Sequence, residues 1–136
     1  MLVLTNQHRE GIFLAAKAGW PNEICGILAG TNNRVEKVFA MRNTSDTPKL
    51  CYLMDPKEQL KISKEIRAAG WEMLGIYHSH AESEAYPSAR DVELAYYPDT
   101  LYFIVSLKDK ANPGLRAFRI VEGTITEEVI KYDAPS

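Results

Sequence analysis

The chain is poor in cysteine. Cys25 and Cys51 are its only two, and they do not form a Cys-x-x-Cys pair. Two cysteines are too few for the disulfide framework of a small secreted domain, and without that pair they predict neither a zinc ribbon nor a thioredoxin-like redox site. We interpret both as buried thiols in a reducing compartment. Cys25 lies two residues after Glu23 and is expected to form a wall of any site built around that acid.

The sequence also lacks an excess of positive charge and a long apolar run. Sixteen Lys and Arg residues oppose 18 Asp and Glu residues, for a net charge of -2, so no phosphate-binding surface for a nucleic acid is predicted. The apolar run at 101–107 is far shorter than the roughly 20 residues of a membrane helix. The N-terminus has no basic region followed by an apolar stretch, as a signal peptide would. We expect a cytoplasmic protein with no nucleic-acid or membrane partner.

The remaining composition is that of a globular domain. Of the 136 residues, 46% are apolar and 25% are charged, which is enough apolar material for one core. No repeat, low-complexity tract or Pro/Gly/Ser-rich linker divides the chain. We therefore expect a single domain spanning residues 1–136.

Hydrophobic periodicity alternates between helices and strands. Helices are predicted at 6–18, 56–69 and 88–97, and strands at 24–29, 35–41, 51–54, 71–77, 101–107, 115–121 and 124–130. The strands at 24–41 and 115–130 form two hairpins, which argue against a purely parallel sheet. The prediction is an α/β fold in which about three helices sandwich a mixed sheet of six or seven strands.

The segment His78-Ser79-His80 follows the strand predicted at 71–77. Side chains two residues apart on a strand point to the same face, so His78 and His80 can bind one ion together. An imidazole pair suits Zn, Cu, Fe or Ni. Taken alone, such a pair is more often solvated or hydrogen-bonded in a core.

A third ligand is available at the start of the next predicted helix. Ser88 is placed to cap that helix and Asp91 lies in its first turn. Two histidines and one aspartate leave a tetrahedral metal its fourth position for water, as catalysis requires. Ser88-x-x-Asp91 is also an ordinary capping box, and both interpretations can hold together.

These positions together resemble a known signature. They look like the complete motif of the JAMM (MPN-plus) zinc metallopeptidases. That motif consists here of Glu23, then His78-Ser79-His80, seven further residues, Ser88, two more residues and Asp91. The resemblance covers nearly the whole chain and implies the cytidine-deaminase-like JAMM/MPN fold. Within the family, the segment 84–88 resembles the small prokaryotic peptidases that trim ubiquitin-like sulfur-carrier proteins.

The resemblance implies a role for each residue of the motif. His78, His80 and Asp91 would hold one Zn2+ per chain, and Glu23 would act as general base and then general acid. Ser88 would donate a hydrogen bond to the developing oxyanion, with helix capping as its structural alternative. Ser79 would orient the metal ligands from behind.

The resemblance also implies a partner, a ubiquitin-like sulfur-carrier protein with a C-terminal Gly-Gly. Hydrolysis after that Gly-Gly would release cysteine or another appended residue. The loops at 42–50 and 81–87 are candidate walls for a narrow passage, and Tyr52 and Tyr86 could line it, although burial is the simpler interpretation of Tyr52. An isopeptidase that removes ubiquitin-like proteins from lysines and a non-catalytic MPN scaffold remain alternatives, and homodimerisation stays open.

Overall fold

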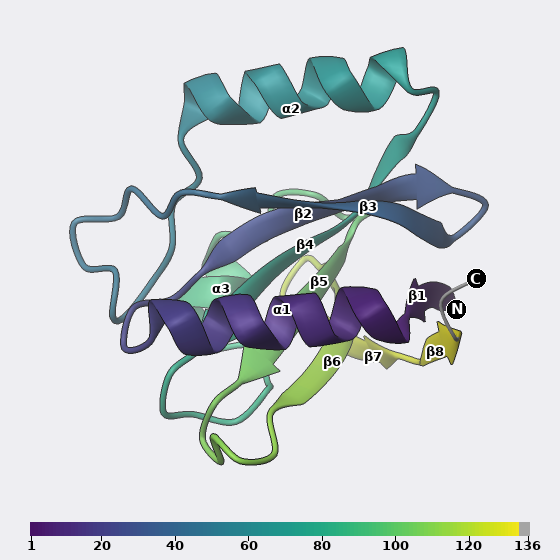
Figure 1. Ribbon diagram of the computed structural model, residues 1–136. Coiled ribbons are helices and arrows are strands. Elements are labelled where there is room, and N and C mark those ends of the chain that lie inside the picture. The colour runs from purple at the N-terminus through teal and green to yellow at the C-terminus, as the bar shows by residue number, and fades with distance from the viewer. Residues whose placement is uncertain (134–136) are drawn as a thin grey trace.

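The computed structural model describes residues 1–133 and shows a mixed sheet flanked by helices (Figure 1). In chain order the elements are β1 (Leu2–Thr5), α1 (Asn6–Gly19), β2 (Cys25–Thr31), β3 (Arg34–Met41), α2 (Pro56–Ala68), β4 (Glu72–His80), α3 (Ala89–Glu93), β5 (Leu101–Ser106), β6 (Gly114–Val121), β7 (Thr124–Glu128) and β8 (Ile130–Asp133). Within this range no helix is both long and apolar enough to span a membrane.

Strand β4 lies in the interior of the sheet, whose strand order is β7-β6-β5-β4-β2-β3-β1-β8. It pairs antiparallel with β2 and parallel with β5. The hairpins β2–β3 and β6–β7 are both present, which confirms the predicted mixed sheet. Only Val129 separates β7 from β8, yet these strands form opposite edges, so the sheet must curl until its two edges approach each other.

Helices α1 and α2 cover opposite faces of the sheet (Figure 1). Leu28 of β2 belongs to the core beneath α1, whereas its neighbour Ile27 packs on the side of Ile66 in α2. This alternation follows from the two-residue period of a strand. A third cluster contains Ile76 of β4 and is covered by Val92 of α3. The prediction of helices sandwiching the sheet is therefore confirmed.

The ends of the two long helices carry capping residues of the kind that favours helix boundaries. Thr5 caps α1 by accepting a hydrogen bond from the backbone N–H of His8 at 3.0 Å. Asp55 caps α2, Pro56 occupies its first position, and Gly70 has the positive φ (75°) that favours glycine beyond a helix end. The Glu58 carboxylate in the first turn of α2 accepts a hydrogen bond from the backbone N–H of Arg42 at 2.8 Å, and so connects the helix start to the end of β3.

Several predicted elements differ from the observed ones in kind or length, and two of them differ most. Residues 51–54 form no strand, because only Met54 makes an isolated bridge, to Asn43, and other backbone groups of the segment bond within the loop. The helix after Ser88 ends at Glu93 instead of residue 97. The backbone N–H of Tyr97 donates to the Tyr102 hydroxyl at 3.0 Å, so it is not available to a helical turn.

Gly30 offers a direct test of the packing between β2 and β3. A β-carbon at this position would collide with the backbone carbonyl of Arg34. We expect Gly30→Ala to destabilise the protein by about 1–3 kcal/mol, because a rigid backbone must shift. Gly11, on the exposed side of α1, has open space around it, so Gly11→Ala should stabilise by about 0.5–1 kcal/mol. Thermal unfolding of both variants checks this, and an unchanged Tm for Gly30→Ala would contradict it.

Candidate active site

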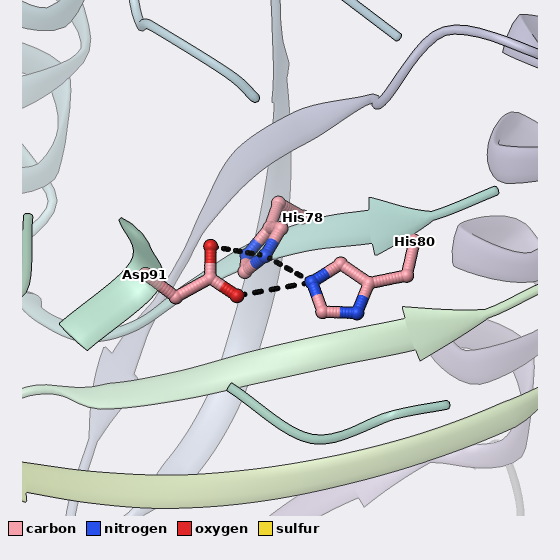
Figure 2. Close-up of side chains that lie close together, drawn as sticks. All are labelled: His78, His80 and Asp91. Carbon is pink, nitrogen blue, oxygen red and sulfur yellow. Dashed lines mark hydrogen bonds and ion pairs between the residues drawn. The ribbon is translucent and has the colours of Figure 1, made fainter. Parts of the chain in front are cut away.

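Two histidines occupy the C-terminal end of β4, which runs three residues further than predicted and ends at His80. His78 lies opposite Cys25 of β2 and beside Ile104 of β5, so the sheet fixes its backbone on both sides. The relative exposure is 1% for His78 and 5% for His80. As predicted from their spacing, both rings reach the same face of the strand (Figure 2).

Asp91 reaches the histidines from the first turn of α3. The Ser88 hydroxyl accepts a hydrogen bond from the Asp91 backbone N–H at 3.1 Å, and the Asp91 carboxylate accepts one from the Ser88 backbone N–H at 2.9 Å. The same carboxylate lies 3.2 Å from Nε2 of His78 and 3.0 Å from Nε2 of His80 (Figure 2). The capping box thus turns the Asp91 side chain toward the end of β4. Asp91 therefore both caps α3 and presents its carboxylate to the two histidines.

The three side chains form a cluster suited to a metal ion. One ligand atom from each of His78, His80 and Asp91 lies within 4.8 Å of the others. His80 Nδ1 is 2.9 Å from the carbonyl oxygen of Glu84, so it is the nitrogen that donates there and Nε2 faces the cluster. Two imidazoles and a carboxylate in this arrangement fit a divalent transition metal such as zinc.

The charge states of the cluster favour ligation. Burial disfavours ionisation of Asp91, but the neighbouring His78 and His80 outweigh it and hold the pKa of Asp91 well below its usual range. Burial lowers the pKa of His78 and so favours its neutral form. Burial also acts to lower the pKa of His80, yet Asp91 and the Glu84 carbonyl outweigh it and raise that pKa. A metal cation and a proton therefore compete for the His80 ring.

Glu23 lies just before β2, close to the cluster but not part of it. Its relative exposure is only 7%, and its Oε1 has no hydrogen-bond partner among the described residues. Burial raises the pKa of Glu23 to about 7; His80 acts to lower that pKa and Asp91 acts to raise it, both with smaller effects. A carboxyl group with this pKa can accept and release a proton near neutral pH.

A cavity of about 430 Å3 opens over these groups. Its lining residues are Pro21, Glu23, Lys49, Leu50, His80, Ala81, Glu82, Ser83 and Ser88. The two loops predicted as walls, 42–50 and 81–87, each contribute to it. The structure thus brings all five residues of the predicted motif to one place, with three on the cavity surface and His78 and Asp91 directly behind His80.

Two neighbouring residues have contacts that the sequence did not specify. The Ser79 hydroxyl accepts a hydrogen bond from the backbone N–H of Ile24 at 2.8 Å, so it anchors the residue after Glu23. The predicted role for Ser79 was to orient the histidine ligands, but within residues 1–133 its hydroxyl makes no hydrogen bond to His78 or His80. The ring of Tyr52 stacks on His78 with centroids 4.5 Å apart and planes 22° apart. The partly buried Tyr52 therefore supports a cluster residue. The sequence did not indicate this role because α2 and most of β4 lie between the two residues along the chain.

The two thiols differ in environment. Cys25 is buried, which raises its pKa to about 12, and its Sγ lies 3.7 Å from the carbonyl oxygen of Met41. It packs in the core and pairs with His78 across the sheet, but it is not among the residues that line the cavity, so it does not form the predicted wall. Cys51 is buried beside the Ser45 and Thr47 hydroxyls, whose hydrogen bonds lower its pKa. Both are free thiols in the structure.

Comparison with known proteins identifies the class. The family model for prokaryotic homologues of the JAB domain matches residues 5–121. A CysO-cysteine peptidase from Mycobacterium tuberculosis is 42% identical over 117 residues, which cover 85% of this chain and 80% of the relative. A desampylase from Haloferax volcanii is 37% identical over 77% of this chain and 80% of its own length. With its His-His-Asp cluster beside a buried glutamate, the chain is a JAMM-type metallopeptidase.

Solved structures support the fold of this class. A solution structure of a protein from Desulfitobacterium hafniense superposes with a TM-score of 0.89 at 37% identity, covering 99% of this chain and 94% of that one. A JAB1/MPN domain protein from Archaeoglobus fulgidus gives 0.66 at 16% identity, covering 98% and 97%, and supports the fold alone. The chain belongs to the family of prokaryotic JAB-domain homologues, and the predicted JAMM/MPN fold is confirmed.

Proposed function

We propose that this protein is a zinc-dependent peptidase that hydrolyses the bond after the C-terminal Gly-Gly of a ubiquitin-like sulfur-carrier protein. The product would be cysteine or another single appended residue. The observation that carries the proposal is the His78–His80–Asp91 cluster, because its His80 lines the same cavity as Glu23, whose pKa is raised to about 7. The name of the CysO-cysteine peptidase, a relative over most of the chain, supports the choice of substrate.

We assign one Zn2+ per chain to His78, His80 and Asp91. Zinc bound there would lower the pKa of a coordinated water to about 7 and polarise the scissile carbonyl. The chain prepares the ligands for it. Asp91 is held as a carboxylate by its neighbours, and the Glu84 carbonyl fixes the orientation of the His80 ring.

Glu23 and Ser88 take the catalytic roles beside the cluster. Oε1 of Glu23, which has no hydrogen-bond partner within residues 1–133, accepts a proton from the attacking water. The resulting carboxylic acid passes that proton to the departing amine. The Ser88 oxygen already accepts the hydrogen bond from Asp91, so the Ser88 O–H proton remains free to donate. In the cavity it donates to the carbonyl oxygen as negative charge develops there.

The pKa of Glu23 predicts the acid limb of the pH profile. Its raised pKa means that the carboxylate is lost as the pH falls through about 7, and a protonated general base is inactive. We expect kcat/KM to fall about tenfold per pH unit below that point. Glu82, an exposed acid of the same cavity, serves as control, and Glu82→Gln should leave the limb in place. A limb centred near the ordinary glutamate pKa would contradict the assignment.

The substrate is tested by intact mass spectrometry. A ubiquitin-like carrier that ends in Gly-Gly-Cys is incubated with zinc-loaded protein, and Glu23→Gln serves as the blank. The proposal predicts loss of one cysteine residue with the wild type alone. An unchanged mass under conditions where the protein holds zinc would overturn it.

A second candidate is isopeptidase action on a carrier joined to a lysine. The desampylase among the relatives favours including it. The discriminating substrate is a carrier linked through its C-terminal glycine to a lysine of a folded protein. Release of that protein, with the Gly-Gly-Cys carrier left intact, would move the assignment from trimming to deconjugation. A purely structural scaffold is disfavoured, because all five residues of the motif are present and converge.

A further inference from the structure

One side chain closes the loop that connects β3 to α2, here called the 43–54 loop. The side-chain carbonyl of Asn43 accepts hydrogen bonds from the backbone N–H groups of Ser45 and Leu53, each at 3.0 Å. Its amide nitrogen donates to the carbonyl oxygens of Cys51 at 3.0 Å and Glu23 at 2.9 Å. An asparagine amide offers two donor hydrogens and two acceptor lone pairs, so its capacity is fully used.

One of these hydrogen bonds connects the 43–54 loop to a residue outside it, the candidate general base Glu23. Glu23 precedes β2, so the sheet does not hold its backbone. The 43–54 loop holds it instead: the Glu23 N–H donates to the carbonyl of Pro48 at 2.7 Å, and the Glu23 carbonyl accepts from Asn43. Removing the Asn43 amide would leave that carbonyl without its donor in a largely buried position.

The Glu23 side chain has no comparable support. Its Oε1 makes no hydrogen bond among the described residues, so backbone placement and packing must set where the carboxyl group points. The 43–54 loop also contributes Lys49 and Leu50 to the cavity wall. Asn43 therefore connects the wall that substrate would touch with the residue that would move the proton.

We propose that Asn43 is a positioning residue for the peptidase reaction, which locks the 43–54 loop and orients Glu23 through its backbone carbonyl. This inference rests on the role of Glu23 in the proposed function. Displacing a catalytic group by about 1 Å can cost about a hundredfold in rate while substrate binding is little changed. The signature of a positioning role is thus a loss in kcat with little change in KM.

Asn43→Asp tests the donor function of the Asn43 amide apart from its acceptor function. The aspartate retains acceptors for Ser45 and Leu53 but loses both donated bonds, including the one to Glu23. We expect kcat on the Gly-Gly-Cys carrier to fall about 10- to 100-fold, with KM changed less than about threefold. Zinc content should stay at one per chain. Should this variant fail to fold, Asn43→Ser carries the same expectation.

Thr44→Val is the matched control. It removes one hydrogen bond of the same loop, from the Thr44 hydroxyl to the Leu53 carbonyl at 3.0 Å, without touching Glu23. It should keep kcat within about twofold, because exposed hydrogen bonds contribute little. Wild-type kcat in Asn43→Asp, or an equal loss in Thr44→Val, would overturn the proposal.

Amide hydrogen exchange at Glu23 provides a readout that does not depend on activity. Because the Glu23 N–H bonds to the loop, its exchange should accelerate at least tenfold in Asn43→Asp and remain at the wild-type rate in Thr44→Val. Unchanged exchange in Asn43→Asp would refute the proposal that Asn43 holds the Glu23 backbone in place. A different result would separate the two proposals: the wild type cleaves no carrier, yet exchange at Glu23 is still faster in Asn43→Asp. In that case the proposed function fails, but the positioning of the Glu23 backbone by Asn43 is supported.

Discussion

Replacing His78 with alanine is expected to remove metal and activity together. His78 contributes one of the three ligand atoms and is almost completely buried, so no other described side chain can take its place. Loss of a residue that merely orients a ligand costs about 10- to 100-fold in metal affinity, so loss of a ligand should exceed about 100-fold. Metal content by plasma mass spectrometry should fall from one zinc per chain to a trace, and carrier cleavage should be undetectable.

His8 makes a matched control for this experiment, because it is a histidine of α1 outside the His78–His80–Asp91 cluster. His8→Ala should retain both zinc and activity. His78→Ala also removes the ring on which Tyr52 stacks, so a lower Tm is expected in addition. One zinc per chain in folded His78→Ala would show that the cluster is not the metal site.

Glu23→Gln is expected to abolish turnover and leave the metal in place. The amide keeps the shape of the carboxyl group but cannot accept the proton of the attacking water, so kcat should fall about 10²- to 10⁴-fold. Zinc content and KM should remain near their wild-type values, because Glu23 is outside the ligand cluster. Single-turnover kinetics with the Gly-Gly-Cys carrier measure the loss.

Stability gives this substitution an independent signature. Burial makes ionisation of Glu23 unfavourable in the folded protein, so above pH 7 the wild type carries a charge that the environment opposes. The pKa is raised, and the unfavourable effect on stability therefore grows as the pH rises from the unfolded value toward 7. Metal-free Glu23→Gln should have a Tm at pH 8 equal to or above that of the wild type.

The kinetic result decides the catalytic role of Glu23. Wild-type turnover in Glu23→Gln would eliminate Glu23 as general base.

The His78–His80–Asp91 cluster could be predicted from sequence because two local rules fix its geometry. Strand alternation places His78 and His80 on one face, and a capping box points Asp91 back from the helix start. Both rules act over a few residues, and the structure confirms both. The proximity of Glu23 spans more than 50 positions and came from the resemblance to a known motif, not from local pattern.

Features that depend on long-range contacts could not be predicted. The segment 51–54 has the composition of a strand. However, the Asn43 side chain accepts a hydrogen bond from the backbone N–H of Leu53 and donates one to the carbonyl of Cys51, so these groups do not pair with a neighbouring strand. Strands β1 and β8 are short and pair with each other from opposite ends of the chain, which no local pattern reveals. For the same reason Asn43, eight to 20 positions from two of its partners, looked like an ordinary loop residue.

The most direct measurement is a zinc titration of metal-free protein that records bound metal and carrier cleavage in the same samples. Wild-type activity should rise with bound zinc and reach its plateau at one ion per chain, since His78, His80 and Asp91 form one cluster. Asp91→Ala should gain neither. Full cleavage by wild-type protein that contains no metal would contradict the proposed zinc peptidase.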